Sequence, residues 1–296
     1  MTKLCAATFR LVSIWGVPAY LHTVMMDGTI NLGRTYQRSR GMADVAFRAD
    51  ELGRLYQSGA AKALLPRRHG GAHEVVLVNT AGGITGGDAY SYGCTASATD
   101  VIVTTQAAER AYRSSTADIA SMDVKLGASD GASLHWLPQE TILFDGSRIN
   151  RRIEVELDAH SECIVLESLV FGRHAMGETL RNCHFTDRWR IRRDGRLVHA
   201  EALTLAHDVP ALLSAASGAD GAQMAATLLY VGPRLEQVRD EIAATLPTLR
   251  SRAAVSSWQG RLVVRLIAAE TMWGKADIAQ ILNSMHGQQV PRVWQS

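Results

Sequence analysis

Between residues 72 and 201 the chain is a succession of short β-type segments, and this succession most constrains its fold. Apolar or β-branched runs occur at Glu74–Asn79, Val101–Thr105, Ser133–Leu137 and Glu162–Val170. Turn-forming Gly, Asp and Ser residues separate the runs, as at Asp194-Gly195, where a two-residue hairpin is expected. Many short strands with turns between them predict an all-β sandwich, barrel or solenoid.

The C-terminal third has a different pattern. Apolar residues recur at helical spacing from Leu235 to Leu246 and from Ile278 to Met285. A strand is expected between these helices at Leu262–Ala268, and the small, polar stretch Ser214–Gly221 is the best candidate for a linker. We expect one domain over residues 33–296, mostly β to about residue 213, with an α/β part at about 222–290.

Composition and charge exclude several classes of protein. The net charge is +2 without a dense basic stripe, so nucleic acid is not an expected partner. The four cysteines show no C-x-x-C spacing, which indicates reduced thiols and a cytoplasmic location. The apolar run Leu11–Met26 is shorter than the about 20 residues that span a bilayer and lacks a cleavage site. We therefore expect no membrane association, and we interpret residues 1–32 as an N-terminal extension.

The most unusual segment is the glycine-rich stretch NTAGGITGGD, Asn79–Asp88, which follows an apolar strand as a phosphate-binding loop would. It lacks both the G-x-G-x-x-G spacing of a dinucleotide loop and the lysine of a Walker A loop. Asp88 occupies the place of that lysine, where its charge would repel phosphate. The segment is therefore expected to form a tight double turn at which backbones pass closely, built on its paired glycines Gly82, Gly83, Gly86 and Gly87.

Motifs of catalysis and of tight metal binding are absent or weak. Neither S-x-x-K nor H-E-x-x-H occurs. His69 and His73 have the spacing of a helical ligand pair, but the two glycines between them oppose a helix. We therefore expect neither an enzyme active site nor a tight metal site.

Two glutamates lie in apolar surroundings, Glu140 in LPQET and Glu167 in IVLESLV. A carboxylate is costly to bury there unless it is paired or hydrated. An ion pair is the default expectation, and the candidate partners are Arg110, Arg113 and Arg173. The alternative is a water-filled path for cations, since carboxylate oxygens bind divalent ions.

Six segments follow one another along the chain: Gly53–Pro66 (GRLYQSGAAKALLP), Asn79–Asp88, Thr104–Ser114 (TTQAAERAYRS), Leu137–Asp145 (LPQETILFD), Glu167–Glu178 (ESLVFGRHAMGE) and Pro291–Trp294 (PRVW). Taken together and in this order, they resemble the urease accessory protein UreD (UreH) family. The resemblance extends from Gly33 to Trp294, and the residues before it match nothing in the family pattern.

The resemblance implies a fold and a function that composition does not show. Members of the family are mostly β, with strands in a helical, β-helix-like stack and a small α/β part near the C-terminus. They bind the accessory protein UreF, which carries the GTPase UreG, and the complex docks on the urease apoprotein. Nickel is in transit through the complex to the urease active site, no cofactor is bound tightly, and no substrate is turned over. We therefore expect a urease maturation chaperone.

The hypothesis assigns roles to particular residues. The acids expected to line a polar nickel path are Asp88, Glu140, Glu167 and Glu178. The residues expected to orient these acids or pack beside them are Arg110, Tyr112, Arg113, Phe171 and Arg173. The residues expected to contact a partner are Gly82, Gly83, Gly86, Gly87 and Trp294. Two alternatives remain open: a β-stack interaction module without a metal role, and an acid–base enzyme that uses Glu140 and Glu167.

Overall fold

The structure, a computed structural model, describes residues 25–26, 29–30, 37–67, 70–285 and 290–294. Residues 1–37 form a unit of their own, in which β1 (Met25–Met26) pairs antiparallel with β2 (Thr29–Ile30). All the other elements belong to the second unit, residues 38–296. Most of the predicted extension, residues 1–32, lies outside the described residues.

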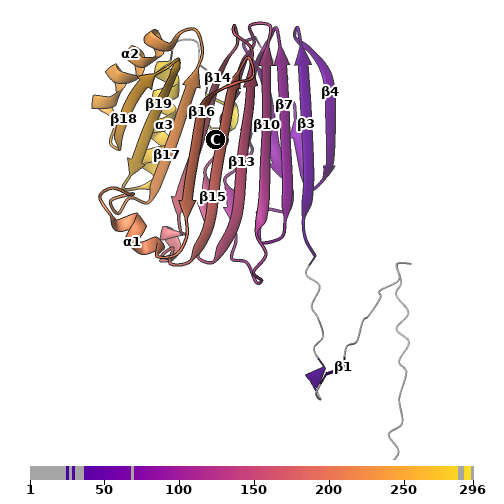
Figure 1. Ribbon diagram of the computed structural model, residues 1–296, viewed down its shortest axis with the longest axis vertical. Helices are drawn as coiled ribbons and strands as arrows, with labels where there is room; N and C mark the ends of the chain where they lie inside the picture. Colours follow the sequence, from indigo (N-terminus) through magenta and orange to yellow (C-terminus); the bar gives the residue numbers. More distant parts are fainter. Residues whose placement is uncertain (1–24, 27–28, 31–36, 68–69, 286–289, 295–296) are drawn as a thin grey trace, which may run out of the picture. The chain divides into compact units, whose positions relative to one another are not determined.

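One of the two sheets of the second unit has seven strands (Figure 1). Their spatial order is β16 (Arg196–Leu205), β15 (Cys183–Arg193), β13 (Ser147–Leu157), β10 (Ala120–Ser129), β7 (Ala89–Ser97), β3 (Arg40–Arg48) and β4 (Glu51–Gly59). The strands from β15 to β3 are parallel to their neighbours, whereas β16 and β4 close the two edges as antiparallel strands.

The other sheet has ten strands. Its main path is β18 (Arg252–Trp258), β19 (Arg261–Ala268), β17 (Met224–Val231), β14 (Glu162–Phe171), β11 (Ser133–Trp136), β8 (Asp100–Thr105), β6 (His73–Asn79) and β5 (Ala61–Leu64). The short strands β9 (Glu109–Ala111) and β12 (Thr141–Leu143) pair with each other, and β12 also pairs with β14. β6, β8, β11 and β14 are parallel neighbours.

The chain passes back and forth between the two sheets as it advances. β6 is followed by β7 in the other sheet, and the same alternation continues through β8, β10, β11, β13, β14 and β15. Each sheet therefore grows by one strand per coil, which is the winding of a β-helix. The prediction of a mostly β, helically stacked fold is confirmed, as is the Asp194-Gly195 hairpin, where both residues have positive φ, 50° and 73°.

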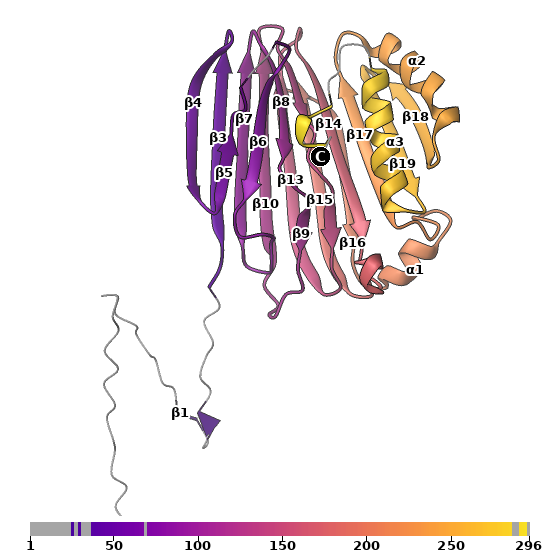
Figure 2. The same cartoon turned by 180° about the vertical axis from the view of Figure 1, so that it is seen from behind.

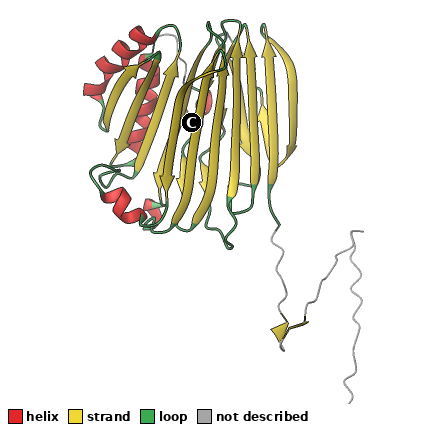
Figure 3. Cartoon of the chain, viewed as in Figure 1, coloured by secondary structure: helices red, strands yellow, loops and turns green. Residues whose placement is uncertain are grey.

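Helices occupy the C-terminal part of the chain (Figure 3). The α-helices are α1 (Val209–Ser214), α2 (Leu235–Thr245) and α3 (Thr271–Ser284), and the 3-10 turns are η1 (His174–Met176), η2 (Leu246–Thr248) and η3 (Arg292–Trp294). The two predicted helices and the strand between them are confirmed. α3 lies across the outer face of the ten-stranded sheet (Figure 2).

Side chains that alternate along each strand create two apolar layers. Val165 and Leu169 of β14 belong to the interior layer between the sheets. Ile164 and Leu166 of the same strand instead pack in the outer layer, together with Ile278 of α3. Successive side chains of β14 therefore point alternately into the interior layer and into the outer layer.

The glycine-rich segment forms the predicted tight double turn. A Cβ atom on Gly83 would lie 2.7 Å from the Arg110 carbonyl oxygen and would overlap the Tyr112 ring. A Cβ atom on Gly86 would collide with the Asp118 carbonyl oxygen. These two glycines are required because neighbouring backbone passes too close for any side chain.

Gly82 and Gly83 allow a matched test of this packing. Both have positive φ, 76° and 153°, but nothing lies within 4 Å of a Cβ atom added to Gly82. Gly82→Ala should cost about 1 kcal/mol of backbone strain and lower Tm by about 3 °C. Gly83→Ala adds the collision with Tyr112 and should lower Tm at least twice as far. Thermal unfolding followed by circular dichroism measures both, and equal shifts would contradict the close approach.

Candidate functional site

Three charged side chains meet in the interior between the sheets: Arg151 of β13, Glu167 of β14 and Asp187 of β15. Each is at most 4% exposed. The Arg151 guanidinium donates to both oxygens of Asp187, from Nε at 3.1 Å and from Nη2 at 2.7 Å. Its Nη1 forms an ion pair with Glu167 Oε2 and donates to Thr141 Oγ1 at 3.2 Å. Arg151 therefore joins the two sheets through a buried charge network.

Strand phase and register explain how these side chains come together. Arg151 has the inward phase of Ile149 and Ile153 in β13, and Asp187 has that of Trp189 in β15. The two strands pair with Arg151 directly opposite Asp187. Sequence reasoning missed both residues, although the alternation in each strand was the signal that could have found them.

Glu167 is the less neutralised acid of the network. Trp136 Nε1 donates to Glu167 Oε1 at 2.7 Å, and the other partner of this carboxylate among the described residues is the shared Arg151 guanidinium, at Oε2. Burial raises the pKa of the Glu167 carboxyl, although the Arg151 guanidinium opposes that shift. Two carboxylates share one guanidinium, so the fully ionised network has one negative charge in excess. A proton or another cation at Glu167 would balance it.

The structure corrects the partner expected for Glu167, which is Arg151. The three arginines expected in that role are exposed: Arg110, Arg113 and Arg173. Arg113 and Arg173 lie in loops that follow the ends of strands, and Arg110 lies in the short strand β9. Arg151 instead lies at an inward position within the long strand β13. Arg151 is therefore the partner of Glu167 because its inward position in β13 places the guanidinium in the interior, where the Glu167 carboxylate lies.

Glu140 also has a partner that differs from the expected one. Its carboxylate is 3.1 Å from Lys275 Nζ of α3. Because α3 packs on the outer face of the ten-stranded sheet, Glu140 is directed toward the outer layer, whereas Glu167 is in the interior. The structure does not bring Glu140 and Glu167 together, which argues against an acid–base enzyme that uses both.

The motif segments lie at the carboxyl ends of β6, β8, β11 and β14. Because these strands are parallel neighbours, their carboxyl ends lie side by side at the same end of the sheet. Tyr112 there packs edge-on to Phe144, with ring centroids 4.9 Å apart. The Arg173 guanidinium lies 4.4 Å from the centroid of the Phe144 ring, and its Nε donates to Glu178 Oε2 at 3.1 Å. We call this group the Phe144 cluster: Tyr112, Arg113, Phe144, Asp145, Arg173 and Glu178.

Asp145 anchors the Phe144 cluster and was missed by sequence reasoning, although it ends the LPQETILFD segment. Its Oδ1 accepts hydrogen bonds from the backbone N–H groups of Arg181 and Asn182, at 2.9 and 2.7 Å. Arg113 Nη2 donates to its Oδ2 at 2.8 Å. Burial opposes ionisation, but these hydrogen bonds outweigh it and lower the pKa of Asp145. Arg113 therefore orients Asp145, not a buried glutamate.

Asp88 fastens the glycine turn. Its two carboxylate oxygens accept from the backbone N–H groups of Ser39, at 2.7 Å, and Thr85, at 2.9 Å. Tyr112 Oη donates to the Gly82 carbonyl at 3.1 Å, which links the turn to the Phe144 cluster. The turn and the cluster therefore form one continuous surface at the carboxyl ends of the strands.

Phe171 and Trp294 are the remaining predicted residues. Phe171 is buried in the interior layer. Trp294 is half-buried and its Nε1 donates to Thr104 Oγ1 at 3.2 Å, while Arg292 Nε donates to Glu74 Oε2 at 2.8 Å. These contacts fasten the C-terminal turn η3 to the ten-stranded sheet.

A small cavity of about 120 Å³ lies beside the glycine turn and contains an acid that sequence reasoning missed, Glu109. Asn79 Nδ2 donates to Glu109 Oε1 at 3.2 Å, and Tyr90 Oη donates to Asn79 Oδ1 at 2.8 Å. Burial raises the pKa of Glu109 to about 7, although the hydrogen bond from Asn79 opposes the shift. The signal was its position in the TTQAAERAYRS segment, where it is the one acidic residue.

Within the described part of the chain, no three His, Cys, Asp or Glu side chains converge as metal ligands. His69 lies outside that part, so the expected absence of a tight metal site stays a prediction. Cys94, Cys163 and Cys183 are free thiols. No helix in the same ranges is long and apolar enough to cross a membrane.

The chain does contain one match to the nucleophile motif G-x-S-x-G, at Gly127–Gly131. Ser129 ends β10, and Asp130 and Gly131 turn the chain with positive φ, 57° and 74°. Ser129 Oγ donates to Asp130 Oδ2 at 3.2 Å, so its hydroxyl bonds an acid and not a histidine base. The match is a strand-ending turn, without the strand-to-helix geometry that the motif requires.

Together these features define a β-helical protein with carboxylates paired in its interior and motif loops gathered at one edge of a sheet. A family profile described as UreD urease accessory protein matches residues 39–295. The chain therefore belongs to the UreD urease accessory protein family. Its role is in urease maturation, and it is a helper protein, not an enzyme.

Individual relatives agree with the profile. The chain is 43% identical over 268 residues to the urease accessory protein UreD of Agrobacterium fabrum, which covers 87% of this chain and 92% of that relative. It is 43% identical over 261 residues to UreD of a Jannaschia species, and the match covers 88% of this chain and 97% of that relative. It is 46% identical over 266 residues to UreD of Dinoroseobacter shibae, and the match covers 88% of this chain and 93% of that relative.

The raised pKa of Glu167 predicts a particular pH dependence of stability. A carboxyl whose pKa is higher in the folded state stabilises the fold fully below its unfolded pKa, near 4.5, and less as pH rises through the folded value. Glu167→Gln stays neutral, so its free energy of unfolding relative to wild type should rise between pH 5 and pH 8. The gain should be on the order of 1 kcal/mol per unit of pKa shift.

Glu178→Gln is the matched control for this measurement. The hydrogen bond from Arg173 lowers the pKa of Glu178, so this carboxyl is ionised in both states above pH 5. The difference between Glu178→Gln and wild type should stay flat from pH 5 to pH 8. Urea unfolding at several pH values measures both variants, and parallel curves would contradict the assignment of a raised pKa to Glu167.

Proposed function

We propose that this protein acts in the cytoplasm as the UreD component of a complex with UreF and UreG. In this proposal the complex docks on apo-urease, and interior carboxylates of this chain assist the transit of nickel to the urease active site. The observation that carries the proposal is Glu167, an acid 4% exposed, whose network has one carboxylate more than its guanidinium can neutralise.

The chemistry of Glu167 suits an ion that must leave again. Near neutral pH a raised pKa lets this carboxyl exchange a proton for another cation without leaving a bare buried charge. Carboxylate oxygens are hard ligands that hold Ni²⁺ less firmly than imidazole or thiolate would. Glu109, with its pKa near 7 and its small cavity, offers the same exchange closer to the motif loops.

The other proposed path-lining acids already have partners that an ion would have to displace. Asp88 is held by backbone N–H groups, Glu140 by Lys275, and Glu178 by Arg173. The proposal is therefore strongest at Glu167 and weaker at these three positions. A β-stack interaction module without a metal role would have no need of an acid that lacks a full counter-charge.

Urease activation in cells with limiting nickel tests the path. Glu167→Gln keeps the shape of the side chain and removes its charge, so activation should fall about tenfold, as for a loss of about 1.4 kcal/mol in cation stabilisation. Glu140→Gln should give a smaller loss, because Lys275 already neutralises Glu140. Added nickel should restore part of the activity in both.

Glu154→Gln is the control, because Glu154 is exposed on β13, the strand that carries Arg151. Its activation should equal that of wild type. Full activation by Glu167→Gln and Glu140→Gln at limiting nickel would rule out the lining role. Loss of the protein from the soluble fraction would be detected by immunoblot and would identify a folding defect.

The glycine turn is the proposed contact with UreF, and Ala81 is exposed at its tip. Ala81→Arg leaves all four glycines in place and adds bulk and charge there. Co-purification of UreF should fall about tenfold, since a charge desolvated in an interface is costly. Thr95→Arg, at an exposed position on β7, should retain UreF. Retention of UreF by both variants would place the contact elsewhere.

A further inference from the structure

The seven-stranded sheet ends at β16, but the ten-stranded sheet continues past this edge with β19 and β18, which leaves a step between the two sheets (Figures 1 and 2). Among the described residues, β16 pairs only with β15. The outer edge of β16 therefore presents backbone N–H and C=O groups that no described strand pairs. Free edges of this kind accept an added strand from another chain.

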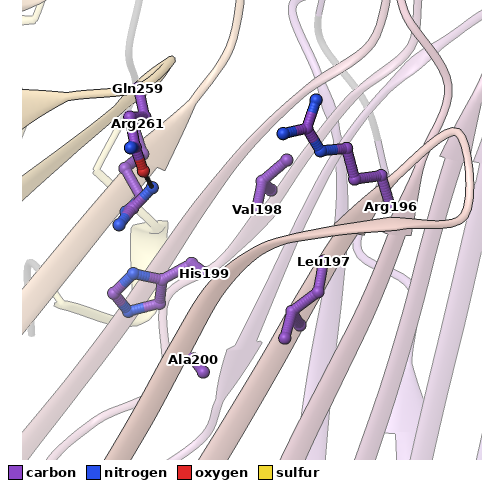
Figure 4. Close-up of a pocket in the computed structure, with 7 residues that line it drawn as sticks. All are labelled: Arg196, Leu197, Val198, His199, Ala200, Gln259 and Arg261. Carbon is purple, nitrogen blue, oxygen red and sulfur yellow. Dashed lines mark hydrogen bonds between the residues drawn. The ribbon is translucent and has the colours of Figure 1, made fainter.

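A groove of about 570 Å³ lies at this step (Figure 4). Its lining comes from β16 and from the hairpin between β18 and β19, and consists of Arg196, Leu197, Val198, His199, Ala200, Gln259 and Arg261. The lining contains two arginines and no acid. One arginine belongs to β16 and the other to β19, so the groove has a cation on each wall.

These cations have no counter-ion within the described residues: neither Arg196 nor Arg261 forms an ion pair there. Arg261 lies over the Trp258 ring, with its Cζ 4.4 Å from the centroid, and donates from Nη1 to Gln259 Oε1 at 3.3 Å. Its Nε has no hydrogen-bond partner in the described chain, and burial lowers the pKa of its guanidinium. A carboxylate in the groove would satisfy this group.

His199, in the same groove, has no close hydrogen-bond partner for its Nε2 among the described residues. It is 5% exposed. Its one recorded polar contact in the described chain is a long one, 3.6 Å to Glu201 Oε2, and Arg265 also binds that carboxylate. Buried polar nitrogens normally have a closer partner, because a polar group taken out of water without a good hydrogen bond destabilises the fold.

The apolar surface further along β16 indicates a polypeptide and not a small ion. Leu203 pairs in register with the buried Asp187, so its side chain has the inward phase, yet it is 38% exposed. A strand added to the edge would cover it. Such a strand would need an acidic side chain near His199 and an apolar one four residues away, near Leu203.

We propose that an extended, acidic segment of a partner protein adds to the free edge of β16 and places a carboxylate between Arg196, His199 and Arg261. This site is remote in sequence from the motif loops, and the proposal does not depend on the nickel path. Backbone hydrogen bonds to β16 supply affinity, and the two arginines and His199 select the acid.

The test uses the full chain and an eight-residue fluorescent peptide, TETTTVTT, whose single Glu is followed four residues later by an apolar Val, with control peptides in which Lys or Gln replaces the Glu. Fluorescence anisotropy at low ionic strength should show binding of the Glu peptide alone. Arg261→Gln and Arg196→Gln should each weaken binding about tenfold, as expected for loss of a charge-assisted hydrogen bond. Arg152→Gln, which removes an exposed arginine on β13, should leave binding unchanged.

Hydrogen exchange gives the second readout. Amides of β16 should exchange more slowly when the Glu peptide is bound, while those of β4 at the opposite edge should not change. Equal weakening by Arg152→Gln, equal binding of the Lys peptide, unchanged β16 exchange, or no binding of the Glu peptide would each overturn the proposal. Circular dichroism melts confirm that every variant tested is folded.

Discussion

The guanidinium of Arg151 sets the charge balance in the interior of this protein. It bonds Asp187 through two hydrogen bonds and pairs with Glu167 from the opposite sheet. Buried charges are tolerated only when such partners are present, and removing one partner leaves the others uncompensated at a cost of about 3–5 kcal/mol. Arg151 is thus needed by both acids, but its geometry favours Asp187. The unequal sharing leaves Glu167 as the group whose charge depends on a proton or an ion.

The winding of the chain makes this arrangement possible. Each coil contributes one strand to each sheet, so inward positions of successive strands lie side by side, as Arg151 and Asp187 do in β13 and β15. The same winding brings the carboxyl ends of β6, β8, β11 and β14 to one edge, with the segments that follow them. Four motifs far apart in the sequence become one surface. The surface holds the glycine turn and the Phe144 cluster, and the buried network lies inside the coils behind it.

The sequence predicted what depends on local pattern. Alternation, apolar runs and turn residues located several of the strands, among them β6, β8, β11, β14 and β19, together with the Asp194-Gly195 hairpin and the two C-terminal helices. The paired glycines predicted the close backbone approach at Gly83. Pairing could not be predicted, because it depends on register between strands: Glu167 meets Arg151 and Glu140 meets Lys275 only once the coils are stacked. Glu109 was missed because its burial comes from the fold around a short strand and not from apolar neighbours in the sequence.

The two proposed sites differ in the physics of recognition, and this difference follows from where each lies in the coil. A buried carboxylate that lacks a full counter-charge binds a cation in exchange for a proton, so the interaction is reversible and sensitive to pH. In the second proposal, an open strand edge with two arginines that form no ion pair with the described residues would bind a backbone and a carboxylate together, so the interaction would be extended and specific. A maturation protein needs both kinds, since the ion must leave while the partners stay assembled. In these two proposals the β-helix separates the sites: the interior of the coil receives the ion, and the final edge of the sheet remains available to a protein.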